Sequence, residues 1–133
     1  FNKQSGLKGL TGENDMRAVR NMVDSEDPEV ARRARLALDI YVTRIIKYIG
    51  SYTAELGGLD VITFTAGIGE NDAELRREVC ERLLPFGVRI DNEINSQRFS
   101  APTTISTDDS SITVMVVPTN EELAIARQAL TLI

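Results

Sequence analysis

Two closely spaced glycines, Gly67 and Gly69, follow an apolar run of the strand type and precede a stretch with helical periodicity. In open α/β sheets, ligands bind where strands end and helix N-termini present free N–H groups. Glycines at such a turn let a phosphate or an adenosine approach the main chain. Asp72 stands where a dinucleotide fingerprint needs a third glycine, and no Gly-Lys-Ser/Thr follows. Nucleotide binding and a plain strand-to-helix turn, with Asn71 as N-cap and Glu74 at the capping-box position, both remain open.

A second polar cluster, residues 119–122, follows the β-branched run "ITVMVVP". Thr119 and Glu122 have the spacing of a capping box, which gives Glu122 a structural role and leaves Glu121 over. A carboxylate at the C-terminal end of a central strand can hold Mg²⁺ beside bound phosphates. The alternative for Glu121 is a solvated first-turn glutamate that complements the helix dipole, and the residues alone favour it.

A third candidate is the sequence Asp15-Met16-Arg17. Asp15 could bond a ribose hydroxyl while Arg17 lies near an adenine ring or a phosphate, or the two could be a helix cap and a surface arginine. The chain contains no histidine. It therefore offers no Ser-His or Cys-His nucleophilic pair and no histidine metal site, so any chemistry must rest on carboxylates, arginines and backbone dipoles.

Length and charge narrow the possible partners. The 133 residues are enough for one ordinary domain with one core. The net charge of −5 and the scattered basic residues argue against nucleic acid as a partner. A single cysteine, Cys80, and the lack of a long apolar run indicate a reduced, cytoplasmic protein that does not span a membrane. Because the first residue is Phe1, we expect a processed start or part of a longer protein.

A long helix is the clearest structural signal. Asp27 can cap it, Pro28 suits its first turn, and Gly57 can end it. One face carries apolar residues at spacings of three and four: Ala31, Ala34, Leu38, Val42, Ile45, Ile49, Tyr52 and Leu56. A helix over 28–56 is about 43 Å long, which exceeds what a domain of this size needs and indicates a helix that spans a larger body.

Strand and helix signals alternate along the rest of the chain, which predicts an α/β sheet. Residues 1–14 are expected to be an extended N-terminal loop, and Asp15 is expected to cap a short helix that follows. Strands are predicted within 60–66, 88–90, 103–106 and 111–119, and helices or helical turns over 71–87, 91–99 and 120–133.

Three motifs taken together carry a family resemblance: "NKQSGLKGLTGENDMR", "IKYIGSYTAELGGLDVITFTAGIGEN" and "VVPTNEELAIAR". Over all 133 residues the chain resembles the C-terminal third of the acetate kinase family. The resemblance implies a partial ribonuclease-H-like α/β domain of the actin-like ATPase and sugar kinase superfamily, with the long spanning helix. It also implies a fragment of a larger two-domain enzyme that transfers phosphoryl reversibly between ATP and acetate with Mg²⁺.

The same resemblance assigns residues to the nucleotide and metal sites. It places Asp15, Met16, Arg17, Gly67, Ile68, Gly69, Glu70 and Asn71 at the ATP/ADP site, and Glu121 at the Mg²⁺ site. It places the catalytic side chains upstream of Phe1, so residues 1–133 alone are expected to be inactive. It further implies a homodimer formed through C-terminal domains.

Two alternatives stay open beside acetate kinase. Propionate kinase shares all three motifs, because the pocket that selects the acid lies outside this stretch. A non-catalytic module that binds ATP or dimerises is the alternative from another class.

Overall fold

The computed structural model describes residues 4–119 and 121–130. The described chain divides into two compact units, with the boundary between Gly58 and Leu59. The expectation of a single domain with one core is therefore wrong. The first unit packs α1 and α2 on the long helix, while the second combines a small sheet with several short helices.

The first unit is entirely helical. It comprises α1 (Gly6–Thr11), α2 (Met16–Asn21), the 3₁₀ turn η1 (Met22–Asp24) and α3 (Pro28–Leu56). The predicted bounds of α3 are confirmed: the Asp27 side chain accepts from the Glu29 N–H at 2.9 Å, and Gly57 ends the helix in the left-handed conformation with a φ of 72°. Asp15 caps α2, also as predicted.

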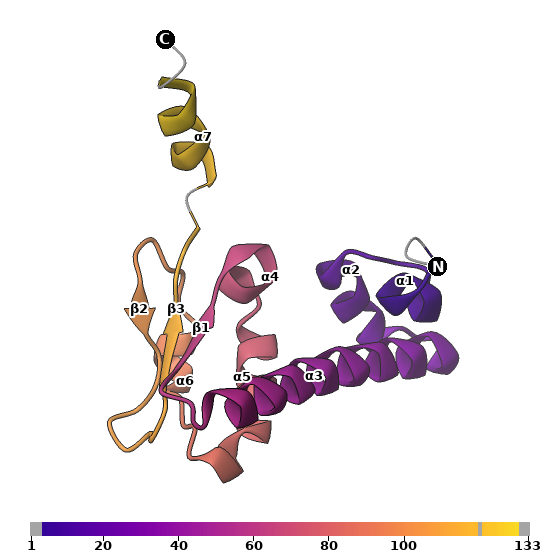
Figure 1. Ribbon diagram of the computed structural model, residues 1–133. Coiled ribbons are helices and arrows are strands. Elements are labelled where there is room, and N and C mark those ends of the chain that lie inside the picture. The colour runs from indigo at the N-terminus through magenta and orange to yellow at the C-terminus, as the bar shows by residue number, and fades with distance from the viewer. Residues whose placement is uncertain (1–3, 120, 131–133) are drawn as a thin grey trace. The chain divides into compact units, whose positions relative to one another are not determined.

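The expected extended N-terminal loop is wrong, because residues 6–11 form helix α1. The hydroxyl of Thr11 donates to the Leu7 carbonyl at 2.8 Å, and Gly12 ends the helix with a φ of 85°. The two glycines inside this segment weaken a helix in isolation. Packing of α1 on α3, visible in Figure 1, therefore provides the stability that the local sequence does not.

Burial along α3 is uneven. Its buried side chains all lie in the N-terminal half, namely Ala31, Ala34, Ala37, Leu38 and Val42. Ile45 and Ile49 are half-buried, whereas Tyr52 and Leu56 are exposed, so the predicted apolar face is covered over only part of its length. Figure 1 shows α1 and α2 along the N-terminal half of α3. None of the described helices is both long and apolar enough to cross a membrane.

The second unit holds a three-stranded sheet with helices beside it. Its elements are β1 (Val61–Phe64), α4 (Ala66–Asn71), α5 (Ala73–Arg82), η2 (Leu84–Phe86), α6 (Asn92–Asn95), β2 (Thr103–Thr104), β3 (Thr113–Val116) and α7 (Glu121–Leu130). The strand order is β1-β3-β2. β1 and β3 are parallel, while β2 runs antiparallel to β3. The parallel pair places the ends of β1 and β3 at one edge of the sheet.

The strand expected over 88–90 is reduced to a single bridge between Ile90 and Ser106. Beside the bridge, the Arg89 N–H donates to the Ser110 hydroxyl at 2.9 Å instead of to a neighbouring strand. Directly after it, the Asp91 carboxylate caps α6, so the extended segment ends there.

The helix expected over 71–87 is divided into α4, α5 and η2. Asp72, and not Asn71, caps α5, because its side chain accepts from the Leu75 N–H at 2.8 Å. Asn71 belongs to the preceding helix, where its amide donates to the Gly67 carbonyl at 2.8 Å. The predicted Asn71 cap is therefore wrong, although the helix itself is present.

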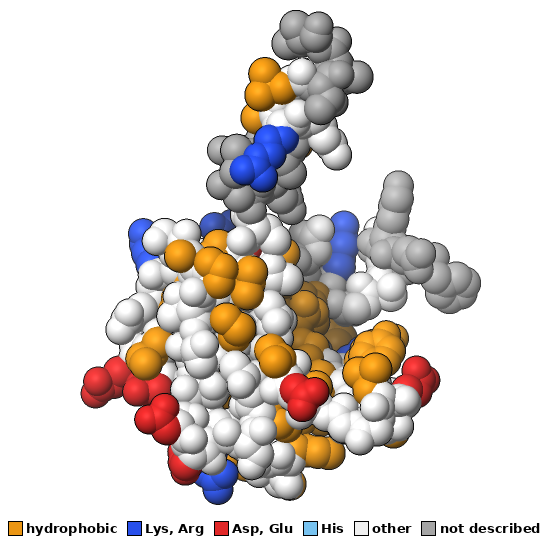
Figure 2. All heavy atoms as spheres, turned by 60° about the vertical axis from the view of Figure 1, so that its left-hand side comes forward, with side chains coloured by type: hydrophobic (Ala, Val, Ile, Leu, Met, Phe, Trp, Pro, Cys, Tyr) orange, Lys and Arg blue, Asp and Glu red, His pale blue; other side chains and the backbone are white. Residues whose placement is uncertain are grey.

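The core of the second unit lies between the sheet and α5. Its fully buried apolar side chains include Val79, Leu83, Val88, Ile105, Val114 and Val116. Large apolar side chains also reach the surface, and Figure 2 shows several hydrophobic side chains on one face. Val61, Leu84 and Phe86 are each about half exposed.

Candidate functional site

The first residue of α4, two positions after the end of β1, is the only described non-glycine residue with a positive φ. Ala66 adopts a φ of 59°. A left-handed conformation costs an L-residue with a β-carbon about 1–2 kcal/mol. Neither Gly67 nor Gly69 has a positive φ, so the sharp change of direction is made by Ala66 and not by the glycines. The glycines at this turn therefore serve another purpose.

The two glycines have different surroundings. A β-carbon on Gly69 would lie 3.2 Å from the main-chain carbon of Phe64, so Gly69 allows α4 to lie against the end of β1. A β-carbon on Gly67 would meet nothing within 4 Å. The main chain at Gly67 is therefore open to an approaching group, while Gly69 has a packing role.

Residues 67–71 are called the glycine loop from here on. A buried arginine, Arg76, fixes this loop through hydrogen bonds to its carbonyl groups. Only 1% of Arg76 is exposed. Its Nη1 donates to the carbonyls of Gly69 at 2.8 Å and Glu70 at 2.9 Å. Its other guanidinium nitrogens donate to the side chain and the carbonyl of Asn95, at 2.7 and 2.6 Å. Burial lowers the pKa of Arg76, yet a guanidinium remains protonated at neutral pH.

Two further contacts complete this arrangement. The Asn95 amide donates to the Ala73 carbonyl at 2.9 Å, and the Arg76 guanidinium carbon lies 5.3 Å from the centre of the Phe99 ring. The loop is thus fixed to α5 and α6 through one cation. Arg76 was not among the residues predicted for the site. The available signal was a charged side chain among the inward positions Leu75 and Val79.

The side chain of Glu70, in the glycine loop, also contacts the second polar cluster of the sequence, residues 119–122. Glu70 Oε1 accepts from the main-chain N–H and from the hydroxyl of Thr119, both at 2.8 Å. These two donors lower the pKa of Glu70. The structure therefore brings the glycine loop and the start of residues 119–122 together within one unit.

The remaining loop residues are placed as follows. Ile68 and Gly69 are half-buried, and Gly67 and Asn71 are exposed. Asn71 stabilises the loop through its bond to the Gly67 carbonyl. The loop is therefore ordered from within while its Gly67 end faces solvent.

Asp15 and Arg17 form a pair on the first unit. Asp15 Oδ2 accepts from Arg17 Nη2 at 2.8 Å, while Oδ1 accepts from the Arg17 N–H at 2.8 Å and from Nε at 3.2 Å. The Arg17 side chain, together with its main-chain N–H, lowers the pKa of Asp15 to about 2. The Arg17 side chain is 90% exposed. The pair is thus charged and accessible, and the capping role of Asp15 is present alongside it.

Met16 lies between these two residues but is only 6% exposed. Its side chain packs into the buried part of the first unit, beside the fully buried Val19. Any contact of Met16 with a ligand would therefore involve its main chain.

The predicted metal residue lies at the start of α7, which begins at Glu121. The side chains of Glu121 and Glu122, and with them the predicted capping box, lie outside the described residues. In the part of the chain that is described, no group of three or more acidic, cysteine or histidine side chains is arranged to hold a metal ion.

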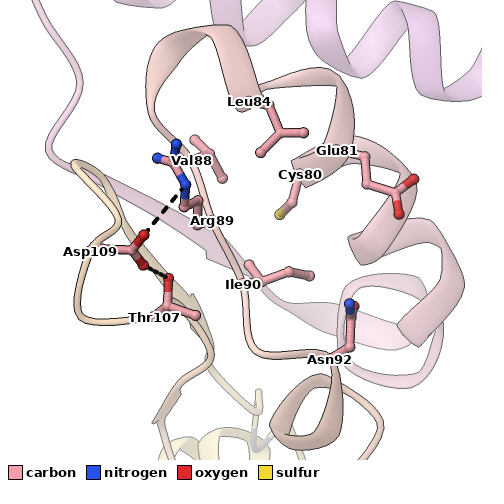
Figure 3. Close-up of a pocket in the computed structure, with 9 residues that line it drawn as sticks. All are labelled: Cys80, Glu81, Leu84, Val88, Arg89, Ile90, Asn92, Thr107 and Asp109. Atoms are coloured by element: carbon pink, nitrogen blue, oxygen red, sulfur yellow. Dashed lines mark hydrogen bonds and ion pairs between the residues drawn. The ribbon is translucent and has the colours of Figure 1, made fainter.

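A cavity of about 280 Å³ lies elsewhere in the second unit, between α5 and the segment that precedes α6 (Figure 3). Its lining includes none of the predicted site residues. Cys80 points into it, and burial raises the pKa of that thiol to about 12. At its rim Asp109 accepts from Thr107 at 2.7 Å and lies 3.5 Å from Arg89. A thiol with this pKa is a poor nucleophile at neutral pH.

Comparison with known sequences decides the family. A profile described as the Acetokinase family matches residues 1–127. The chain belongs to the acetokinase family. It is also 54% identical over 130 residues to an acetate kinase of Leifsonia xyli subsp. xyli, covering 98% of this chain and 32% of that protein. The resemblance seen in the three motifs is confirmed.

Solved structures agree with the fold. An acetate kinase from Entamoeba histolytica matches with a TM-score of 0.85 and 29% identity, over 95% of this chain and 33% of that one. A propionate kinase from Francisella tularensis subsp. tularensis matches with a TM-score of 0.77 and 40% identity, over 92% of this chain and 30% of that one. The predicted fold class, a partial ribonuclease-H-like α/β domain with a long helix, is confirmed. The chain spans about a third of the length of these acetokinase-family proteins.

Proposed function

We propose that this chain is the nucleotide-binding, C-terminal part of an acetate kinase that catalyses ATP + acetate = ADP + acetyl phosphate. The observation that carries the proposal is the open main chain at Gly67, at the end of β1, in a chain that belongs to the acetokinase family. Residues 1–133 are then one portion of a larger two-domain enzyme.

In this proposal the glycine loop lines one side of the adenine pocket. Gly67 leaves room at the main chain, and Ile68 supplies an apolar surface. Gly69, Glu70 and Asn71 keep the loop in its shape through their contacts with Phe64, Thr119 and the Gly67 carbonyl, respectively.

In the same proposal Asp15, Met16 and Arg17 of the first unit also bind the nucleotide. Asp15 Oδ2 accepts one bond from Arg17, which leaves acceptor capacity for a ribose hydroxyl. Arg17 is exposed and can lie over the adenine or beside a phosphate. Met16 lies between Asp15 and Arg17 in the sequence and would contact the nucleotide through its main chain, because its side chain is buried.

Glu121 is proposed to hold Mg²⁺ beside the phosphates, usually through water. The metal would neutralise charge on the phosphates during transfer. Phosphoryl transfer depends on positioning and on stabilisation of charge, so a nucleotide and metal site supplies only part of what catalysis needs. Because no catalytic side chain is assigned to residues 1–133, we expect this portion alone to be inactive.

The proposal also covers the location, the oligomeric state and the partners of the enzyme. We propose a cytoplasmic homodimer that binds ATP or ADP and a short-chain carboxylate, and neither nucleic acid nor a membrane. The C-terminal half of α3 is a candidate contributor to the dimer contact, because Tyr48 and Tyr52 are exposed there and their ring centres lie 6.2 Å apart.

Propionate kinase is the second candidate, because a propionate kinase matches this chain at 40% identity. Acetate kinase is favoured, because a relative with that name is 54% identical. The distinguishing measurement is acyl phosphate formation from ATP with acetate or propionate, trapped with hydroxylamine, by the full-length gene product that contains this chain. Faster formation with acetate supports the proposal, faster formation with propionate supports the second candidate, and no product with either supports a non-catalytic ATP-binding or dimerising module.

A further inference from the structure

We infer that Glu70 and Thr119 form a clasp that positions the Mg²⁺-binding segment relative to the nucleotide loop, so that Glu70 acts through Thr119. This inference rests on the proposed function, since it assigns a role within that site. It makes Glu70 a positioning residue.

The clasp extends the pairing of two parallel strands. Beyond the last pair of the ladder, Phe64 with Val116, the Val117 N–H donates to the Phe64 carbonyl at 2.8 Å. The next contact along the chain is the pair of 2.8 Å bonds from Thr119 to Glu70 Oε1. A side chain thus replaces the main chain as acceptor at the point where the two strands diverge.

Glu70 itself is anchored from the opposite side. Its carbonyl accepts from Arg76 Nη1, and that guanidinium is bound to Asn95 on α6. The main chain of Glu70 is therefore fixed to buried groups, while its carboxylate reaches an exposed threonine. A rigid residue that holds a neighbouring segment by two bonds limits where that segment can lie.

Chain connectivity links the clasp to the metal residue. Thr119 precedes Glu121 by two residues, and two extended residues span at most about 7 Å. Fixing Thr119 therefore limits the volume that Glu121 can sample. Both lone pairs of Glu70 Oε1 are used by Thr119. Loss of the clasp should weaken metal binding more than it weakens binding of the adenosine.

The test is a double-mutant cycle in the full-length enzyme, with Glu70→Ala, Thr119→Val and the double variant. The KM for Mg²⁺ at saturating ATP should rise about fivefold in Glu70→Ala, since a hydrogen bond to a charged group contributes measurably to free energy. Thr119→Val removes only the hydroxyl and should give a smaller rise, and the double variant should resemble Glu70→Ala because both changes break one clasp. Thr119→Ser should retain the wild-type value.

Controls separate positioning from folding. Glu93→Ala removes an exposed glutamate of α6 and should leave the KM for Mg²⁺ unchanged. The clasp is exposed, so the melting temperature of each variant should stay within about 2 °C of wild type.

Three results would overturn the inference. Unchanged Mg²⁺ dependence in both single variants would show that the clasp positions nothing. Additive effects in the double variant, or an effect of Glu70→Ala confined to the KM for ATP, would show that Glu70 contacts the nucleotide directly. A wild-type enzyme that makes no acyl phosphate would contradict the proposed function instead. In that case the clasp is judged from Mn²⁺ affinity in the presence of ADP, measured by electron paramagnetic resonance, where the same fivefold loss is expected and an unchanged affinity contradicts it.

Discussion

The described hydrogen bonds of Asp15 and Arg17 fall within their own turn, whereas those of the glycine loop come from residues as far as 49 positions away. The first region is a local pair on an exposed helix start. The second is tied to α5, α6 and the end of β3 by a buried arginine and an exposed threonine. The two proposed nucleotide-binding regions therefore differ in how rigidly their side chains are held.

This difference bears on how such a site would work. A loop fixed by buried charge keeps its shape before a ligand arrives, which lowers the entropy lost on binding. An exposed ion pair contributes little to stability and can rearrange at small cost. We expect the glycine loop to present a preformed surface and the Asp15–Arg17 pair to adapt to the nucleotide.

The largest expected effect is that of Arg76→Met. The change leaves two loop carbonyls and Asn95 without their donor in a buried setting, which should cost about 3 kcal/mol. Native-state hydrogen exchange of the α5 and α6 amides in the full-length enzyme would measure the loss locally. Arg77→Met is the matched control, since Arg77 makes exposed ion pairs with Glu74 and Glu81 and should change the exchange free energy by less than about 0.5 kcal/mol.

A retained exchange free energy in Arg76→Met would mean that the loop is held by something other than this cation. That result would contradict the proposal that the glycine loop is more rigid than the Asp15–Arg17 pair.

The next effect separates the two glycines. Gly69→Ala forces a β-carbon against the Phe64 main chain and should destabilise the second unit by about 1–2 kcal/mol. Gly67→Ala meets open space and lies within α4, so it should leave stability unchanged or raise it by about 0.5 kcal/mol. Thermal unfolding of the two variants side by side provides the measurement. Equal destabilisation by both would contradict the separate roles.

A third effect concerns the framework of the first unit. Asp27→Ala removes the cap of α3, which accepts from the main-chain N–H groups of Glu29 and Val30, and should cost about 1 kcal/mol. Circular dichroism during urea unfolding reports the change, with the neighbouring exposed Glu26→Ala as control. If both variants unfold alike, the cap contributes nothing beyond surface charge.

The change expected to be smallest concerns the pKa of Asp15. Removing the guanidinium in Arg17→Gln should raise the pKa of Asp15 from about 2 towards 3.8, because Arg17 supplies the main stabilisation of that carboxylate. A depressed pKa means that the pairing stabilises the fold above pH 3.8 and that this contribution is lost as the pH falls through about 2. Carboxyl NMR titration measures it, with Asp109 as an internal reference that should not move. A pKa for Asp15 that stays near 2 would show that Arg17 is not its main partner.

Local signals predicted the long helix well. Asp27, Pro28 and Gly57 fix the ends of α3 through their own backbone and side-chain chemistry, and the structure places both ends where they were predicted. Helix α1 was missed because its support comes from packing on α3, which no nearby residue encodes.

The candidate site was predictable in part. The position of the glycine loop after a strand followed from its sequence, but the separate roles of Gly67 and Gly69 depend on the distance to Phe64. The bonds of Arg76 to Asn95 and of Thr119 to Glu70 join residues 19 and 49 positions apart in the chain, so neither spacing nor periodicity could reveal them.

In the proposed function, the open main chain at Gly67 admits an adenine nucleotide. Calorimetric titration of MgADP into the full-length enzyme, wild type and Gly67→Ala, tests it directly, because this substitution adds one methyl group without disturbing the fold. We predict at least a tenfold loss of affinity, about 1.4 kcal/mol, with an unchanged melting temperature. Equal affinity in the two proteins would contradict the claim.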